Sequence, residues 1–209
     1  MNKNRLEAFS DGVLAIIITI MVLELRVPEE PTWHGVAGVL PTLLSYLLSF
    51  VYVGIYWNNH HHLIQIADRV NGAILWANLH LLFWLSLFPF TTRWMDESGF
   101  VEVPVLVYGI NLLAAAIAFY ILEQALIREQ GKTGAVAQAL GRDWKGKASP
   151  LIYLVGIALT LAQPLLGIAV YTVVALIWLV PDRRVEHFVY RAHQPGDANG
   201  RDLPGHTTP

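Results

Sequence analysis

The chain has 209 residues, of which 55% are hydrophobic and only 14% are charged, and its mean hydropathy is +0.46. A soluble domain of this length carries about a quarter charged residues, so the composition indicates a protein that crosses a membrane several times. The chain contains no cysteine, which excludes disulfides, thiolate metal sites and cysteine nucleophiles. A net charge of −2 provides no general basic field, so we expect no nucleic-acid partner.

The first apolar segment, Arg5–Leu25, carries charge near both ends and is long enough to cross a bilayer. As an α-helix, the stretch from Arg5 to Arg26 would be about 33 Å long, against a hydrocarbon core of about 30 Å. Asp11 lies within its first third, where a carboxylate facing lipid is costly. We therefore expect Asp11 to face protein or water.

Five further apolar segments follow, and the last two come from one long run. Leu151–Val180 holds 30 residues without a charge, which is too long for one ordinary span and short for two. Because Gln163-Pro164 lies near its middle and proline cannot continue a helix, we divide the run there. The predicted spans after the first are Gly38–Asn59, Asn71–Thr92, Val103–Leu126, Ser149–Ala162 and Leu165–Val180.

The distribution of basic residues favours six spans. With six spans and a cytoplasmic N-terminus, all of the 14 Lys and Arg residues except Arg26 and Arg93 lie on the cytoplasmic side. Five spans would place the arginines of the C-terminal tail outside. We therefore predict an all-α, multi-pass protein of the cell membrane with both termini in the cytoplasm. Residues 1–181 would form one six-helix domain, and residues 182–209 a largely disordered cytoplasmic tail.

The first segment carries a narrow aliphatic face. At 100° per residue, this face is aligned with Gly12 and with Arg5 at its foot. Such a face most often contacts lipid or another helix. If several copies of the segment met around an axis, however, the same side chains would form stacked apolar rings, which gate by dewetting, and one ring of hydroxyls. The face consists of Ile16, Thr19, Ile20 and Leu23.

A second feature of this segment is polar and points elsewhere. Ser10 and Asp11 follow Arg5 within the apolar run, so a hydrogen-bonded network between helices fits them better than helix capping. A sharper hypothesis makes Asp11 and nearby histidines a proton relay, although structural networks also account for intramembrane charges. The candidate partners are Trp57, His60, His61, Asn78 and His80.

The consecutive histidines His60-His61-His62 suggest a metal site, but weakly. Three successive side chains cannot all point to one side of a helix, and neither an HExxH motif nor an Asp/Glu cluster accompanies them. Anchoring at the membrane interface explains them more simply. We therefore expect no metal and no enzyme activity; a membrane-embedded metalloenzyme remains an alternative.

The run Arg5-x-x-x-Phe9-Ser10-Asp11, with Gly-Val-Leu-Ala-Ile and Thr19 after it, resembles the bacterial branch of the transmembrane protein 175 family, the lysosomal-type potassium channels. The resemblance extends over the whole chain and is weakest in the last two spans. It implies a six-span subunit and a homotetramer whose first helices line a central pore. Supporting pieces are Leu23-Glu24-Leu25-x-Val27-Pro28, Tyr56-Trp57-x-x-His60-His61, Asn78 and Pro89-Phe90.

The resemblance also implies roles for individual residues. Ile16 would form the constriction, Ile20 and Leu23 further hydrophobic rings, and Thr19 the pore-facing hydroxyl. Phe9, Ser10 and Asp11 would pack the first helix against its neighbours, in a network with Arg5, Trp57, His60, His61 and Asn78. The expected function is passive, potassium-selective or potassium-preferring conduction, with potassium as the permeant ion and no cofactor. The alternative is a proton-coupled secondary transporter using Asp11 and the histidines.

Overall fold

The computed structural model describes residues 3–67, 69–131, 134, 136–137 and 144–179, and the regular structure in this part of the chain is entirely helical. The predicted tail, 182–209, lies outside the described residues. The helices are α1 (Lys3–Leu23), α2 (Trp33–Gly38), α3 (Leu40–Gln65), α4 (Gly72–Ser86), α5 (Phe88–Glu97), α6 (Glu102–Gln130), α8 (Trp144–Ala162) and α9 (Pro164–Leu179).

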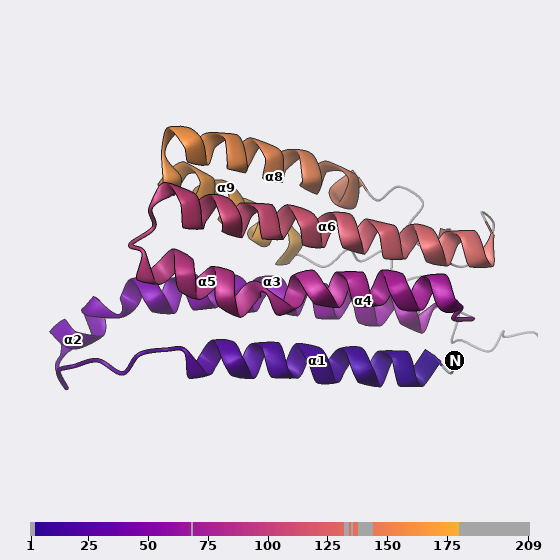
Figure 1. Ribbon diagram of the computed structural model, residues 1–209, viewed down its shortest axis with the longest axis horizontal. Helices are drawn as coiled ribbons and strands as arrows, with labels where there is room; N and C mark the ends of the chain where they lie inside the picture. Colours follow the sequence, from indigo (N-terminus) through magenta and orange to yellow (C-terminus); the bar gives the residue numbers. More distant parts are fainter. Residues whose placement is uncertain (1–2, 68, 132–133, 135, 138–143, 180–209) are drawn as a thin grey trace, which may run out of the picture.

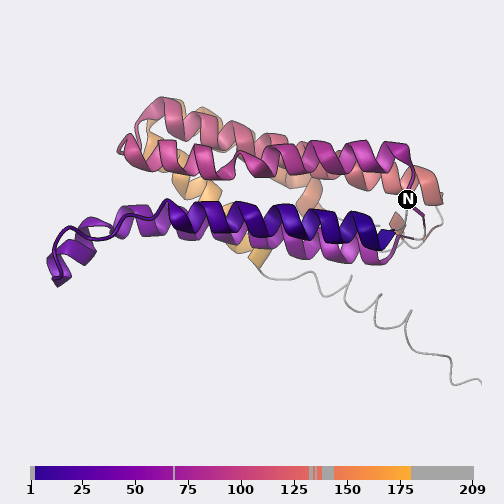
Figure 2. The same ribbon diagram turned by 60° about the horizontal axis from the view of Figure 1, so that its bottom comes forward.

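Most of the long helices lie roughly side by side in a stack, and α9 runs obliquely behind α6 (Figure 1). The first helix, α1, forms one edge and packs against α3, α4 and α5. Next to it, α4–α5 lie on one side of the stack and α3 on the other, as the rotated view also shows (Figure 2). Helix α6 packs on α4, α5 and the α8–α9 hairpin. Only one face of α1 is therefore covered.

Among the described residues, four helical stretches are long and apolar enough to cross a membrane. They are α1, α3, the combined stretch α4–α5 and α6. The apolar parts of α8 and α9 are shorter, at Ala148–Ala162 and Pro164–Leu179. The predicted division of the long C-terminal run is confirmed, because α8 ends and α9 begins on either side of Gln163.

Three predicted spans end too early, and the fourth does so by the smallest margin, since it was expected to end at Leu126 and α6 ends at Gln130. The second was expected to end at Asn59, but α3 continues to Gln65 because the three histidines extend the helix instead of leaving it. The third was expected to end at Thr92, but α5 continues to Glu97. Pro89 does not prevent this, since it lies in the first turn of α5, where its missing N–H is not needed.

The short helix α2 was not predicted. Its signal was a single capping residue: the Thr32 hydroxyl accepts a hydrogen bond from the Gly35 N–H at 3.2 Å.

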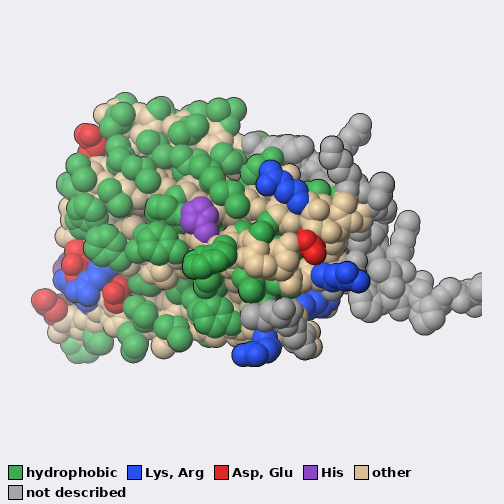
Figure 3. Space-filling model, turned by 45° about the vertical axis from the view of Figure 1, so that its right-hand side comes forward, with side chains coloured by type: hydrophobic (Ala, Val, Ile, Leu, Met, Phe, Trp, Pro, Cys, Tyr) green, Lys and Arg blue, Asp and Glu red, His purple; other side chains and the backbone are tan. Residues whose placement is uncertain are grey.

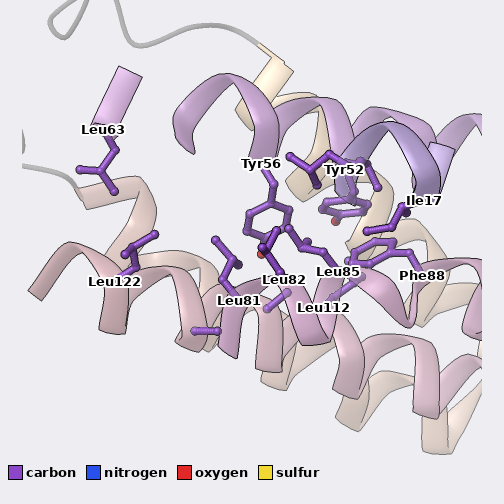
Figure 4. Close-up of a cluster of buried hydrophobic side chains, with 14 of the residues drawn as sticks. Ile17, Tyr52, Tyr56, Leu63, Leu81, Leu82, Leu85, Phe88, Leu112 and Leu122 are labelled. Carbon is purple, nitrogen blue, oxygen red and sulfur yellow. The ribbon is translucent and has the colours of Figure 1, made fainter. Parts of the chain in front are cut away.

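The core forms where α3, α4–α5 and α6 meet (Figure 4). Tyr52, Leu81, Phe88 and Leu112 are almost completely buried there and point toward one another. Ile17 reaches the same cluster from α1. This packing fixes which side of α1 faces inward.

Candidate functional site

The predicted aliphatic face of α1 points away from the rest of the chain. Ile16 is 60% exposed and Leu23 is 77% exposed, and Ile20 and Thr19 are also exposed. On the opposite side of the same helix, Leu14, Ile17 and Met21 are each at most 3% exposed. One helix thus has a buried side that holds it in the subunit and an apolar side that no described residue covers.

Thr19 is the only polar side chain of the four, and its hydroxyl is already engaged. It donates to the carbonyl oxygen of Ala15 at 2.7 Å, within α1 itself. Such a bond satisfies the hydroxyl proton while leaving the oxygen lone pairs facing outward. The arrangement can present an oxygen acceptor to a cation between two apolar levels.

The buried side of α1 is joined to α4 and α3 by a chain of hydrogen bonds. The Asn78 side-chain N–H donates to Ser10 Oγ at 3.0 Å, and the Ser10 hydroxyl donates to the Leu6 carbonyl oxygen at 2.9 Å. His60 Nε2 lies 2.7 Å from Asn78 Oδ1. Ser10, His60 and Asn78 are all buried, so these bonds form away from water, where an unpaired polar group is costly.

The direction of these bonds shows which imidazole nitrogen of His60 carries a proton. Because Asn78 uses its N–H group toward Ser10, its carbonyl oxygen faces His60, and Nε2 of His60 must be the donor. His60 then donates to Asn78, Asn78 to Ser10, and Ser10 to Leu6, so all of these bonds run toward α1. A proton cannot pass along this chain through the amide of Asn78, so the geometry suits a fixed strut better than a relay.

Asp11 is held by a different residue. The Trp57 indole N–H donates to Asp11 Oδ1 at 3.0 Å. The Trp57 ring stacks on His61, with ring centroids 6.0 Å apart, and His61 Nδ1 lies 2.8 Å from Glu7 Oε1. Two contacts, one turn of α1 apart, therefore connect α1 to α3.

The structure does not bring together every residue of the predicted network. Phe9 is 51% exposed, and Arg5 is exposed and makes no hydrogen bond or ion pair with the described part of the chain. His80 bonds neither Ser10 nor Asp11; its Nε2 accepts from the Trp84 indole N–H at 3.0 Å. His80 lies two residues from Asn78, so both cannot face α1 on a helix. Within one subunit these three residues lie outside the hydrogen bonds described above, and the packing roles of Arg5 and Phe9 stay predictions.

Charged residues whose partners sequence reasoning did not predict lie at both ends of α1. At one end, Lys3 Nζ donates to the carbonyl oxygen of Gln65 at 2.8 Å, at the C-terminus of α3, where a cation complements the helix dipole. At the other end, Glu24 lies 3.8 Å from Arg93. Burial raises the pKa of the Glu24 carboxyl, and the attraction of Arg93 only partly offsets this. The sequence offered one indication of these contacts: a cation such as Lys3 is favoured beside the C-terminus of a helix.

The histidine tract does not gather ligands for a metal. Within the described residues, no group of three or more His, Asp or Glu side chains is placed to hold a metal ion. His60 points to Asn78 and His61 to Glu7, in keeping with the rotation of 100° between successive residues of a helix.

Comparison with known proteins gives the family. The family model described as endosomal/lysosomal potassium channel TMEM175 matches residues 5–89. A potassium channel of Chryseobacterium sp. (strain P1-3) is 55% identical over 186 residues, which cover 89% of this chain and 97% of that protein. This chain belongs to the TMEM175 family.

A solved structure agrees with the TMEM175 fold. The crystal structure of a lysosomal potassium-selective channel TMEM175 homolog from Chamaesiphon minutus matches with a TM-score of 0.70 and 29% identity, covering 92% of this chain and 98% of that one. The human endosomal/lysosomal proton channel TMEM175 is 29% identical over 60% of this chain but only 25% of its own length. The region matched by the family model contains α1, α3 and α4, which supply the aliphatic face and its hydrogen bonds.

Proposed function

We propose that the chain is the subunit of a potassium-selective or potassium-preferring channel that conducts passively. One observation carries this proposal: Ile16, Thr19, Ile20 and Leu23 share a single exposed face of α1, whose other face is held by packing and hydrogen bonds. The relatives named as potassium channels support the choice of ion. An ion channel is not an enzyme, and the conduction path needs no cofactor.

The proposed assembly is a homotetramer in the cell membrane, with α1 of each subunit at the central axis. The six spans are α1, α3, α4–α5, α6, α8 and α9, and both termini lie in the cytoplasm. Charged side chains lie toward the two ends of the molecule with a broad hydrophobic band between them, as a membrane-spanning subunit requires (Figure 3). Arg5, exposed near the cytoplasmic end of the aliphatic face, would line the inner vestibule.

Four copies of the aliphatic face would form stacked rings around the axis. Ile16, Ile20 and Leu23 would form apolar rings, which block ions when the pore narrows and loses its water. Thr19 would place a ring of oxygen atoms between the first two of them, able to replace part of the hydration shell of a cation. Ile16, nearest the centre of the bilayer, would form the constriction.

The test is Ile16→Asn, measured as potassium and sodium flux into liposomes. We expect higher conductance and a lower potassium-to-sodium preference, because an amide ring stays hydrated where an isoleucine ring does not. Val22→Asn is the matched control, since Val22 is also exposed on α1 but lies about 120° around the helix from Ile16. Unchanged flux and preference in Ile16→Asn, with the tetramer intact, would remove Ile16 from the constriction.

The alternative of a proton-coupled transporter makes an opposite prediction. It requires flux that saturates and follows a pH gradient, whereas a channel requires flux set only by the gradient of the ion itself. Collapsing the pH gradient with a protonophore should therefore leave potassium flux unchanged. Loss of flux under this condition would favour the transporter.

A further inference from the structure

The two sides of the subunit that flank α1 have different shapes. On the α4–α5 side, large aromatic side chains project outward at intervals of seven, seven and four residues, which places them along one face. Trp76 is 75% exposed and Phe83 and Phe90 are more than half exposed. We call this face the aromatic ridge. It consists of Trp76, Phe83, Phe90 and Trp94.

The opposite side is hollowed. Between α3 and α9, beside α2 and the end of α5, lies an apolar groove of about 600 Å³. Its few hydroxyls are satisfied locally: Ser45 donates to the Pro41 carbonyl oxygen and Thr172 to that of Ile168, each at 2.9 Å. The groove therefore presents no polar group that needs a partner. Its walls include Leu44, Leu47, Val51, Leu165, Ile168 and Leu176.

The ridge and the groove lie on opposite sides of the subunit, with α1 at the edge between them. Figure 1 shows α4–α5 in front of α3 and α9, and Figure 2 shows the same separation after rotation. A ring of identical subunits that turns α1 toward its axis must bring the front of each subunit against the back of the next. Ridge and groove are thus the two surfaces that such a ring would join.

The outer end of the ridge, Phe90 and Trp94, also lies at the depth of the groove. The Ser49 and Thr92 hydroxyls are 2.7 Å apart, so these positions of α3 and α5 are level. The two helices run in opposite directions, which places Trp94 level with about Leu47 and Phe90 level with about Val51. Rotation about the membrane normal does not change depth, so the same pairs are level between copies.

A histidine beside the ridge argues against lipid as its neighbour. His80 is exposed within α4, and because its Nε2 accepts from Trp84, the ring proton is on Nδ1. The described part of the chain offers no acceptor to that proton. Intramembrane ionisable groups almost always face protein or a water-filled cavity.

We propose that the outer end of the aromatic ridge of one subunit, Phe90 and Trp94, lies in the apolar groove of the next, and that this contact, repeated around the axis, closes the tetramer. The occupant of the groove is therefore a second copy of the chain, not the acyl chain of a lipid. The inference rests on the tetramer of the proposed function, and it adds the surfaces that form it.

Cross-linking tests the contact directly, because the chain has no cysteine of its own. Trp94→Cys is placed in one copy and Leu47→Cys in another, the two carry tags of different size, and both are expressed together. Oxidation in membranes should give a mixed dimer that reductant dissolves, and neither single variant alone should give a dimer. A chain carrying both substitutions should give a ladder that stops at four subunits.

A second pair guards against a variant that does not fold: Phe90→Cys with Val51→Cys should behave in the same way. The matched control is Trp94→Cys with Leu161→Cys, since Leu161 is exposed near the corresponding end of α8. If neither test pair cross-links in intact tetramers, or if the control cross-links equally, the inference is wrong.

Potassium flux, measured on the reduced protein, keeps the two proposals apart. Flux without cross-links would overturn only the ridge-and-groove contact, with a lipid chain as the remaining occupant of the groove. Cross-links without flux would support the contact and overturn only the channel.

Discussion

Two regions of the molecule are held together by different kinds of contact. Between α1 and its neighbours, buried polar side chains reach from helix to helix, as in the bonds from Asn78 to Ser10 and to His60. Between α8 and α9, hydrogen bonds such as Thr160–Tyr171 and Trp178–Ser149 are also present, but here the helices α6, α8 and α9 in addition approach closely around one aromatic ring. Tyr171 is completely buried, and a Cβ atom added to Gly156 would lie only 2.5 Å from its Cε1.

The difference separates two requirements on a channel subunit. Close packing fixes the distance between helices but tolerates small rotations about their axes. A hydrogen bond from the side of a helix fixes rotation as well, because its geometry fails when the donor turns away. On α1 a rotation of 100° would exchange one residue for the next at the axis. We therefore expect damage to the Tyr171 contacts to affect stability, and damage to the Asn78 contacts to affect conduction too.

The largest loss of stability should come from Gly156→Ala. The added methyl group has no room beside Tyr171, and we expect a loss of about 1–3 kcal/mol in the free energy of unfolding. Gly54→Ala is the matched control, since a Cβ there meets nothing within 4 Å and alanine favours a helix. Thermal unfolding in detergent measures both. Ion preference per folded channel should not change in either variant, and a change in Gly156→Ala would contradict the division between the two regions.

Asn78→Leu should cost less stability and more function. It leaves the His60 Nε2–H without an acceptor and removes the donor to Ser10, at a cost of about 1–2 kcal/mol. Potassium flux per tetramer should also change, because α1 loses the contact that sets its rotation. Ser86→Ala is the control: within the described part of the chain, its hydroxyl bonds only the Phe83 carbonyl oxygen of its own helix. Reduced stability with normal flux would show that the bonds only stabilise the fold.

Trp57→Phe also tests whether hydrogen bonds set the rotation of α1, and its effect should be smaller than that of Asn78→Leu. It keeps a ring but removes the N–H that donates to Asp11, a loss of about 1 kcal/mol at a partly exposed carboxylate. Trp84→Phe removes an indole donor as well, but one that bonds His80 within α4. Flux should therefore change in Trp57→Phe and remain normal in Trp84→Phe. Equal changes in the two variants would remove Asp11 from the contacts that orient α1.

Much of this arrangement follows from sequence periodicity. The exposed face of α1 could be predicted because four side chains at helical spacing necessarily share one side. The partner of Ser10 could not be predicted in this way. Asn78, His60 and His80 were equally plausible, and only the rotation of α4 decides that Asn78 faces α1 while His80 faces away. That rotation depends on packing against α6, which a sequence pattern does not specify.

Element ends were predicted less well for a related reason. Polar residues such as His60 and Arg93 were taken to lie beyond the ends of spans, yet both lie within helices. His60 is buried with Asn78 as its partner, whereas Arg93 is exposed and bonds Glu97 one turn further along α5. The pairing of Glu24 with Arg93 joins residues far apart in the chain and could not be read from either one.

The smallest effect should come from Glu24→Gln, and it should depend on pH. Burial raises the pKa of Glu24 above its ordinary 4.5, so the folded protein holds this proton more tightly than the unfolded chain does. Between the pKa of Glu24 in the unfolded chain and its higher pKa in the folded protein, the free energy of unfolding falls as pH rises. Above both pKa values it stays lower. The glutamine has no proton to lose, so the stability of Glu24→Gln does not fall over this pH range. At neutral pH the variant should therefore be more stable than the parent by less than about 1 kcal/mol, and in acid the two should be equally stable. Arg93 and Arg26 attract the Glu24 carboxylate of the parent, and Glu97 and Asp96 repel it, so the comparison measures the balance of these charges together with burial. A parent more stable than the variant at neutral pH would mean that the attraction of Arg93 outweighs burial, and that this outer contact also holds α1.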